Sequence, residues 1–286
     1  MTSSALATAT TLRGRTVAVI GLGCIGGSLA RDLSSADARV LGFDRDTASL
    51  AAAVDAGAVH RALDATLDGI EHADWLVLAT PVDESPALLE ALAPRLTHLR
   101  LITDVGSTKS AIVRTACRLG LERFVGGHPF AGSHRCGWDA SRPGLFRDAT
   151  VYLCPAASSR GEALADARTL WGALGARIVE CSAAEHDTHL AWVSHLPHLA
   201  SFALALTLDT HGEAHDDLGT GGRDAVRLAA SAPAVWRAIA MENRELLAAA
   251  VDALEGELHA LRTALERGDS DTLGRRIERA AAWCSA

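Results

Sequence analysis

A strand-like run followed at once by a glycine loop constrains the fold of this chain more than any other feature. Residues 16–20 are apolar and β-branched, which is typical of a parallel strand buried on both faces. The G-x-G-x-x-G loop from Gly21 to Gly26 follows, and then leucines at helical spacing from Leu29 to Leu33. A strand, this loop and a helix in that order predict a Rossmann-like dinucleotide-binding unit, with the helix N-terminus facing the pyrophosphate.

An acidic residue after the next strand indicates which dinucleotide is bound. Residues 39–43 form the second predicted strand, and Asp44 ends it 18 residues after Gly26. A carboxylate at this place accepts hydrogen bonds from the adenosine ribose and repels a 2′-phosphate, so NAD is predicted over NADP. The positive charge of Arg45 next to it could reduce this preference. The predicted cofactor contacts lie in this loop and in the turns after the following strands: Gly21, Gly23, Cys24, Ile25, Gly26, Asp44, Arg45, Thr80, Pro81, Ser107 and Lys109.

Strands and helices then alternate, which predicts an α/β fold with a doubly wound, mainly parallel sheet. The predicted strands and helices up to residue 181 are 74–81, 83–93, 101–104, a helix starting near 110, 123–125, 148–155, 159–174 and 176–181. Beyond residue 182 no strand is predicted, and long Ala/Leu-rich helical segments follow at 183–211, 233–267 and 270–284, with breaks at Gly212, at 219–222 and at Gly268. We therefore expect a dinucleotide-binding domain over residues 1–182 and a helical substrate and dimerisation domain over residues 183–286.

His128 follows the short predicted strand 123–125, and two glycines and Pro129 surround it. We expect these residues to stop the strand and to leave His128 on a rigid bend at its carboxyl end. Open α/β sheets bind ligands at that edge, and an imidazole with an ordinary pKa of about 6.5 can accept a proton near neutral pH. The other interpretation is a buried histidine that caps a turn. Ser107 likewise is either a helix N-cap or a catalytic contact.

Histidines gather on the first long helical segment, at positions 186, 189, 195 and 198, beside Asp187. Histidine pairs three residues apart share one helical face, an arrangement that a metal site could use. No H-E-x-x-H motif or thiolate partner accompanies them, and we predict no metal. The alternative is that His195 and His198 face a cleft against the nucleotide-binding domain.

Charge and composition exclude several classes of partner. The 286-residue chain has a formal net charge of −8 and a pI near 5.8, which argues against nucleic acid and against an anionic membrane surface. The longest lipophilic stretch, 199–208, is shorter than the roughly 18–20 residues of a membrane span. Six scattered cysteines with no C-x-x-C pair and no secretory signal indicate reduced thiols, so a cytoplasmic protein is predicted.

Taken together, these motifs resemble the prephenate dehydrogenase family in order and spacing, over nearly the whole chain. The resemblance is carried by five groups of residues: Gly21-x-Gly23-x-x-Gly26-x-Ser28, Asp104-x-Gly106-Ser107-x-Lys109, Gly127-His128-Pro129-x-Ala131-Gly132, His186-Asp187 with Ser194-His195-Leu196-Pro197-His198, and Arg227 with Trp236. The H-P-x-A-G and S-H-L-P-H motifs are more specific than the glycine loop. The resemblance implies an NAD-dependent oxidoreductase of tyrosine biosynthesis and a homodimer made by the helical domain.

The resemblance also implies roles for individual residues. His128 would be the catalytic histidine and Ser107 its hydrogen-bond partner, while His198 and Arg227 would contact a dianionic substrate. The other implied substrate contacts are His195, Trp236, Ser133 and His134. Position 134 is often acidic or polar in the family and is histidine here, which leaves the contacts to the substrate's side chain and feedback by tyrosine open. The chain ends at Ala286 without an appended module, so we expect no allosteric site of the separate-domain kind.

Three readings of the function remain open at this point. The first is oxidative decarboxylation of prephenate to 4-hydroxyphenylpyruvate, CO2 and NADH. The second is the same chemistry on arogenate or 4-amino-4-deoxyprephenate, which share the ring of prephenate. The third is a dimer that senses NAD without catalysis, which would need no joint presence of His128, Ser107 and Arg227.

Overall fold

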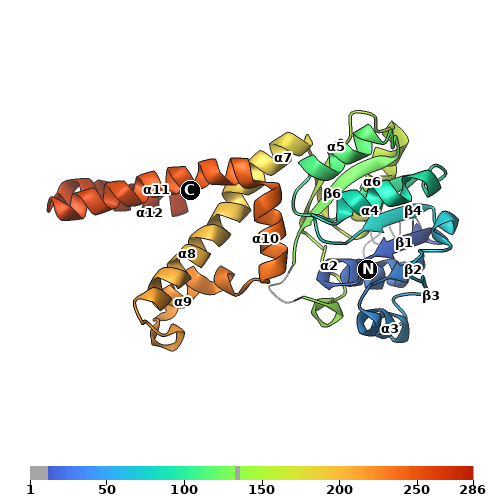
Figure 1. Cartoon of the computed structure of the whole chain (residues 1–286), viewed down its shortest axis with the longest axis horizontal. Helices are drawn as coiled ribbons and strands as arrows, with labels where there is room; N and C mark the ends of the chain where they lie inside the picture. Colours follow the sequence, from blue (N-terminus) through green and yellow to red (C-terminus); the bar gives the residue numbers. More distant parts are fainter. Residues whose placement is uncertain (1–11, 133–135, 286) are drawn as a thin grey trace.

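The computed structural model of the protein describes residues 12–132 and 136–285. These residues form a sheet flanked by helices and, beyond it, an all-helical part that extends away from the sheet (Figure 1). The sheet has the strand order β3-β2-β1-β4-β5-β6-β7-β8, and its neighbouring strands are parallel except for the antiparallel pair β6 and β7. The predicted α/β class with a mainly parallel sheet is therefore confirmed.

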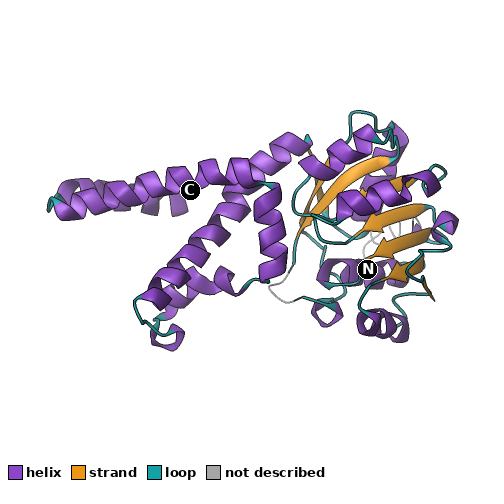
Figure 2. Ribbon diagram, viewed as in Figure 1, coloured by secondary structure: helices purple, strands orange, loops and turns teal. Residues whose placement is uncertain are grey.

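Helices cover both faces of the sheet (Figure 2). Residues of β1 alternate between the two apolar clusters: Val17 and Val19 belong to the cluster that α2, α3 and α6 cover, and Ala18 and Ile20 to the cluster that α4 and α5 cover. The strands are β1 (Thr16–Ile20), β2 (Arg39–Phe43), β3 (Arg61–Ala62), β4 (Trp75–Leu78), β5 (Leu101–Asp104), β6 (Phe124–Phe130), β7 (Thr150–Pro155) and β8 (Arg177–Glu180). The helices of this part are α2 (Cys24–Ser35), α3 (Thr47–Asp55), α4 (Ser85–Leu92), α5 (Ser110–Arg118) and α6 (Gly161–Ala173), with short 3-10 turns η1 (Ile70–His72), η2 (Ala93–Arg95) and η3 (Trp138–Ala140).

Strand β6 differs from the sequence-based expectation. It does not stop at the glycines but continues through His128 and Pro129 to Phe130, paired with β7 along its whole length. Pro129 is tolerated because β5 pairs with β6 only as far as Val125, so the second half of β6 has a strand on one side only. Gly127 is required by contact rather than by a turn, since a Cβ there would lie 2.5 Å from the carbonyl oxygen of Asp104. His128 therefore sits within a strand, not on a bend.

The helical part begins directly after β8. Its elements are α7 (Ala183–Leu190), a π-helical turn η4 (Ala191–His195), α8 (Leu196–Thr210), η5 (His215–Asp217), α9 (Thr220–Val226), η6 (Arg227–Ala230), α10 (Pro233–Glu242), α11 (Arg244–Glu266) and α12 (Ser270–Cys284). Two expectations were wrong here. The glycine run at 219–222, expected as a break, begins α9, and the expected segment 233–267 is two helices that meet at Asn243. Asn243 has a non-helical backbone, and its side chain bonds to the α7 and η4 region instead.

The residues from Ala183 to Thr210 form one continuous helical stretch of 28 residues with a mean hydropathy of 1.2. Among the described residues, this is the one helix that is long enough and apolar enough to cross a membrane, judged by length and composition. The apolar helical stretch is therefore longer than the expected 199–208, because the π turn joins α7 to α8 without a break. A single helix of this kind is weak evidence for a membrane span, and 22% of its apolar window is buried within the protein.

Candidate functional site

A cavity of about 930 Å³ lies where the carboxyl ends of β1, β4, β5 and β6 meet the helical part. Two sides of the molecule contribute to its lining. From the sheet side come the glycine loop, the turns after β4 and β5, and β6; from the helical side come η4, α8, η6 and α10. Eleven of the residues predicted from sequence line it: Gly23, Cys24, Ile25, Gly26, Thr80, Pro81, Ser107, His128, His198, Arg227 and Trp236.

The glycine loop has the geometry of a dinucleotide cradle. Gly21 has a φ of +94°, which favours glycine, and it makes the tight turn after β1. A Cβ on Gly26 would lie 1.9 Å from the carbonyl oxygen of Gly21, so only glycine lets α2 pack this closely on the strand. Gly23 caps α2 without a side-chain hydrogen bond, and this end of the helix lies at the cavity, where a helix N-terminus favours a phosphate. These residues fit a dinucleotide pyrophosphate.

Asp44 lies just after β2 and is fixed by backbone donors. Its carboxylate accepts hydrogen bonds from the N–H groups of Leu22, at 2.6 Å, and Asp46, at 2.8 Å. The acid is thus held against the glycine loop, where it could accept from a ribose. Arg45 turns away to an exposed ion pair with Glu84 at 3.0 Å, so its charge is already partnered on the surface.

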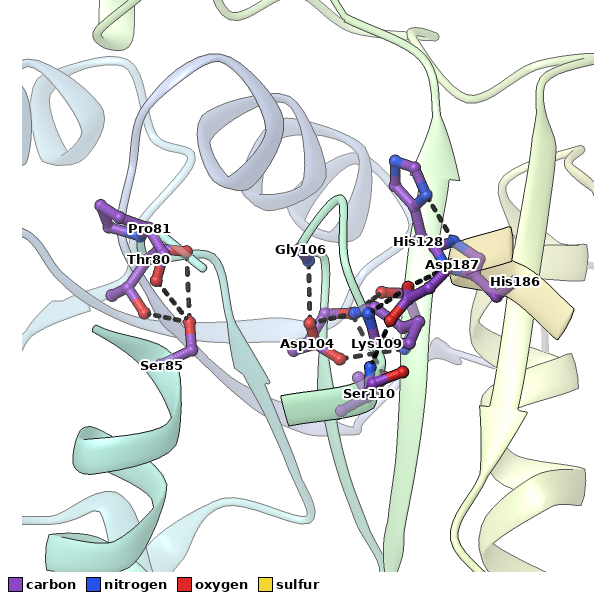
Figure 3. A network of polar contacts seen from close by, with 12 residues as sticks. Thr80, Pro81, Ser85, Asp104, Gly106, Lys109, Ser110, His128, His186 and Asp187 are labelled. Atoms are coloured by element: carbon purple, nitrogen blue, oxygen red, sulfur yellow. Dashed lines mark hydrogen bonds and ion pairs between the residues drawn. The ribbon is translucent and has the colours of Figure 1, made fainter. Parts of the chain in front are cut away.

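His128 projects from β6 into the cavity with only 6% of its surface exposed. Its Nδ1 lies 2.8 Å from Nε2 of His186 on α7 (Figure 3). Burial, reinforced by nearby His186, Lys109 and His195, lowers the pKa of His128 well below its usual value. The imidazole is therefore neutral at neutral pH and available as a base.

His186 in turn contacts Asp187. Its Nδ1 lies 2.8 Å from Oδ1 of Asp187, and the same carboxylate accepts hydrogen bonds from the backbone N–H groups of Lys109 and Ser110, both at 2.8 Å. Burial by itself raises the pKa of Asp187, but the bonds from His186, Ser110 and Lys109 together outweigh it and lower that pKa. Burial lowers the pKa of His186, against the opposing effect of Asp187. A neutral histidine thus lies between His128 and an ionised carboxylate.

Lys109 lies at the start of α5, as the sequence predicts, but its side chain is buried. We expected a cofactor contact, but its amine is fully buried and forms an ion pair with Asp104, and it also donates to the carbonyl oxygen of Gly127 at 2.7 Å. A lysine without solvent must be paired, and these partners occupy two of its three donors. Ser107 lines the cavity in the turn after β5, as expected, whereas the ring partner found for Nδ1 of His128 is His186 rather than Ser107.

The helical side of the cavity is formed by His198, Trp236 and Arg227. The rings of His198 and Trp236 stack with centroids 3.5 Å apart, and Nδ1–H of His198 donates to the carbonyl oxygen of Ser194 at 2.9 Å. Arg227 is exposed at the start of η6. An exposed guanidinium beside a stacked histidine can bind a carboxylate.

His195 lies beneath this wall rather than on it, with 1% exposure. Nδ1 accepts from the Asn243 amide at 3.1 Å, and within the described ranges its Nε2 has no hydrogen-bond partner. Burial lowers the pKa of His195 to about 4, so the ring is neutral. Ser133 and His134, the remaining predicted substrate contacts, lie outside the described residues. Of the residues that are described, no three His, Cys, Asp or Glu side chains gather as a metal site.

Two parts of the site escaped the sequence reasoning. The contact of His128 with His186 joins residues 58 positions apart, and the adjacent His186-Asp187 pair was the only signal in the sequence that pointed to it. Asn243 was read as the interior of a helix, although it donates to the backbone oxygen of Asp187 at 2.9 Å as well as to His195. No local pattern in the sequence marks that residue.

Comparison with known proteins agrees with this geometry. The family model described as "Prephenate dehydrogenase, nucleotide-binding domain" matches residues 29–180, and "Prephenate dehydrogenase, dimerization domain" matches residues 182–279. The chain is 35% identical to the prephenate dehydrogenase of Bacillus subtilis over 271 residues, which cover 91% of this chain and 72% of that protein.

Solved structures give the same result. A crystal structure of prephenate dehydrogenase from Aquifex aeolicus, in complex with hydroxyphenyl propionate and NAD+, superposes with a TM-score of 0.84 at 29% identity and covers 95% of this chain and 97% of that one. A crystal structure of Synechocystis arogenate dehydrogenase superposes with a TM-score of 0.78 at 31% identity, covering 94% and 99%. On its sequence, its fold and the geometry of its cavity, the chain belongs to the prephenate dehydrogenase family.

Proposed function

We propose that the protein catalyses the NAD-dependent oxidative decarboxylation of prephenate to 4-hydroxyphenylpyruvate, CO2 and NADH. The observation that carries the proposal is a neutral, buried His128 in the same cavity as a dinucleotide-binding glycine loop and an exposed arginine. The Bacillus subtilis and Aquifex aeolicus relatives, named prephenate dehydrogenases, support this substrate. The alternative substrate arogenate has support from the Synechocystis structure. A sensor without catalysis would not need the His128, His186 and Asp187 arrangement.

NAD, held by the glycine loop, would supply the hydride acceptor for the ring carbon that bears the hydroxyl. His128 takes the hydroxyl proton on its free nitrogen, Nε2, as a general base. The resulting dienone is vinylogous to a β-keto acid, so loss of CO2 makes the ring aromatic. His128 then returns the proton to the ring oxygen, and the protein neither gains nor loses a proton over the cycle. Ser107, in the same cavity, would contact the hydroxyl or the cofactor.

The proposed cofactor contacts are the glycine loop, Thr80, Pro81 and Asp44. The loop fits a pyrophosphate because Gly23 leaves the end of α2 without a side-chain cap. Asp44 favours a ribose without a 2′-phosphate. Cys24 and Ile25 form part of the cavity wall beside the loop. The amine of Lys109 is engaged elsewhere, so we assign it the role of holding Asp104 and β6 instead.

The proposed substrate contacts come from the helical part, residues 183–286, with residues 1–182 as the dinucleotide-binding domain. Arg227 would bind one carboxylate of the substrate. His198, held by its stacking on Trp236, would contact the other polar groups of the substrate. Gripping the carboxylate that leaves as CO2 would stabilise the ground state against decarboxylation. The side-chain carboxylate is therefore the better partner for Arg227. His195 would act from beneath, by supporting Trp236 at a ring distance of 6.0 Å.

We also propose a cytoplasmic homodimer. In the part of the chain that the structure describes, Cys117, Cys136, Cys154, Cys181 and Cys284 are free thiols, the state that a reducing compartment maintains. The family model over residues 182–279 is described as a dimerization domain. Eleven large apolar side chains stay exposed on the helical part, where a partner chain could cover them: Trp192, Val193, Leu204, Leu206, Val235, Met241, Leu246, Leu258, Leu265, Ile277 and Trp283.

The test of the proposed function is NADH formation measured side by side with prephenate, arogenate and 4-amino-4-deoxyprephenate. We expect the highest kcat/KM with prephenate and NAD, and a lower kcat/KM when NADP replaces NAD, because Asp44 repels the 2′-phosphate. A higher kcat/KM with arogenate would move the assignment to that substrate. Absence of turnover with all three would favour the sensor.

His128→Asn should lower kcat by about 10²–10⁴-fold and leave the KM for prephenate nearly unchanged, because asparagine can hydrogen-bond the hydroxyl but cannot take its proton. In the wild type, kcat/KM should fall on the acid side only below the ordinary histidine pKa of about 6.5, since burial lowers the pKa of His128. Steady-state kinetics across pH measure both effects. An asparagine variant with most of its kcat would place the base elsewhere.

Arg227→Gln should raise the KM for prephenate by roughly thirtyfold or more, because the bound substrate would exclude water from the arginine–carboxylate pair, and losing one partner of such a pair costs about 2–5 kcal/mol. The KM for NAD should not change. Arg223→Gln is the matched control: it removes an exposed arginine one turn earlier, whose side chain donates to the backbone oxygen of Asp216. Equal KM values for the two variants would mean that Arg227 is an ordinary surface arginine.

Sedimentation at micromolar concentration should give about twice the 29.9 kDa mass of one chain. Leu206→Glu, which puts a charge on a side chain that is 65% exposed on α8, should shift the protein towards monomer. Val54→Glu on α3 is the control, because it charges an exposed apolar side chain of the sheet domain. A wild-type monomer would refute the dimer.

A further inference from the structure

We propose that His186 is a positioning residue for His128: together with Asp187 it holds His128 in the tautomer that keeps a proton on Nδ1 and presents an unprotonated Nε2 to the cavity. The inference rests on the proposed function for its catalytic meaning, because it specifies which nitrogen of the base is free. The tautomer itself is a property of the protein alone and can be measured without substrate.

The directions of the hydrogen bonds follow from Asp187. An ionised carboxylate only accepts, so Nδ1 of His186 must donate to Oδ1 over the 2.8 Å contact. A neutral His186 then has a lone pair on Nε2, and it accepts from Nδ1–H of His128, also at 2.8 Å. The remaining nitrogen of His128 is therefore the unprotonated one. Figure 3 shows the ring of His128 directed at His186 through one nitrogen, with the other turned away from it.

Asp187 is held in place from two domains. Its carboxylate oxygens accept from the N–H groups of Lys109 and Ser110 at the start of α5, both at 2.8 Å. Its backbone oxygen accepts from the Asn243 amide at the turn between α10 and α11, at 2.9 Å. With three donors fixing Asp187, the two imidazoles have little freedom to rotate, which is what a base of defined tautomer requires.

Burial and the neighbouring His186, Lys109 and His195 disfavour a proton on His128, and Asp187 is the group that offsets them during the reaction. The groups that face His128 are His186, Lys109 and His195, and those that face His186 also include Asp187, Asp104 and, edge-on at 5.3 Å, the ring of Tyr152. Asp104 pairs with Lys109, and His195 is neutral, so Asp187 supplies the unpaired negative charge. It stabilises the imidazolium that forms when His128 takes the substrate proton. Nδ1–H stays on His128, Asp187 stays ionised, and the proton on Nε2 later returns to the ring oxygen.

Two substitutions at one position separate positioning from packing. His186→Gln keeps an acceptor, because its amide oxygen can receive Nδ1–H of His128, but it cannot be protonated. His186→Leu fills the space and removes the acceptor. We expect His186→Leu to lower kcat by about 10²-fold and His186→Gln to lower kcat by only about tenfold. The KM values for prephenate and NAD should stay near those of the wild type.

The spectroscopic readout is the ¹⁵N signal of the His128 ring, assigned through His128→Asn. The wild type and His186→Gln should show a protonated Nδ1 and an unprotonated Nε2, and His186→Leu should shift towards protonated Nε2. The acid limb of the kcat/KM profile should also differ between His186→Leu and the wild type. His189→Leu is the control, because it changes an exposed histidine on the same helix that touches Tyr152 but not His128; it should leave the ring signal and kcat unchanged.

Equal losses of kcat in the glutamine and leucine variants would overturn the proposal, because they would indicate a packing role. A wild-type His128 protonated on Nε2 would overturn it as well. Failure of the proposed function is distinguishable: the wild type would then form no NADH with any of the three substrates, whereas the ¹⁵N spectra would still decide the tautomer.

Discussion

The buried ion pair between Asp104 and Lys109 holds together the turn after β5 and strand β6, which carry two of the proposed catalytic residues. Asp104 ends β5, and its carboxylate also accepts from the N–H groups of Gly106, at 2.8 Å, and Gly127, at 3.1 Å, while Lys109 donates to the Gly127 oxygen. One pair of charges thus fixes both the turn that carries Ser107 and the strand that carries His128. Removing one partner of such a pair leaves an uncompensated buried charge, which typically costs about 3–5 kcal/mol.

A second carboxylate joins this arrangement to the helical part. Asp187 sits on α7 and caps α5, so the sheet-side turn and the first helix of the other domain share one acceptor. His186 extends the connection to His128, and η6 and α10 bring Arg227 and Trp236 to the opposite wall. The proposed base and cofactor loop thus come from the sheet domain, and the arginine proposed to bind the substrate comes from the helical part. The proposed reaction requires the two parts to be correctly placed relative to each other.

Sequence reasoning succeeded where the signal is local and failed where contacts over long distances decide. The strand, glycine loop and Asp44 follow one another closely, so the dinucleotide fold could be predicted. The turn rules for glycine and proline failed at β6, because pairing with β7 and the close approach of Gly127 to Asp104 override them. Lys109 was predicted as a cofactor contact because it follows the turn after β5, at the same edge of the sheet as the glycine loop. Its side chain is instead buried against Asp104, five positions earlier, and against the Gly127 oxygen of β6.

The measurement that tests the account most directly is a crystal structure of this protein with NAD+ and hydroxyphenyl propionate, the ligand pair named for the Aquifex aeolicus relative. The account predicts the nicotinamide and the ring side by side in the cavity, the ring hydroxyl within hydrogen-bond distance of Nε2 of His128, and the carboxylate on Arg227. A hydroxyl bound away from His128, or a carboxylate held by sheet-domain residues instead of Arg227, would contradict it.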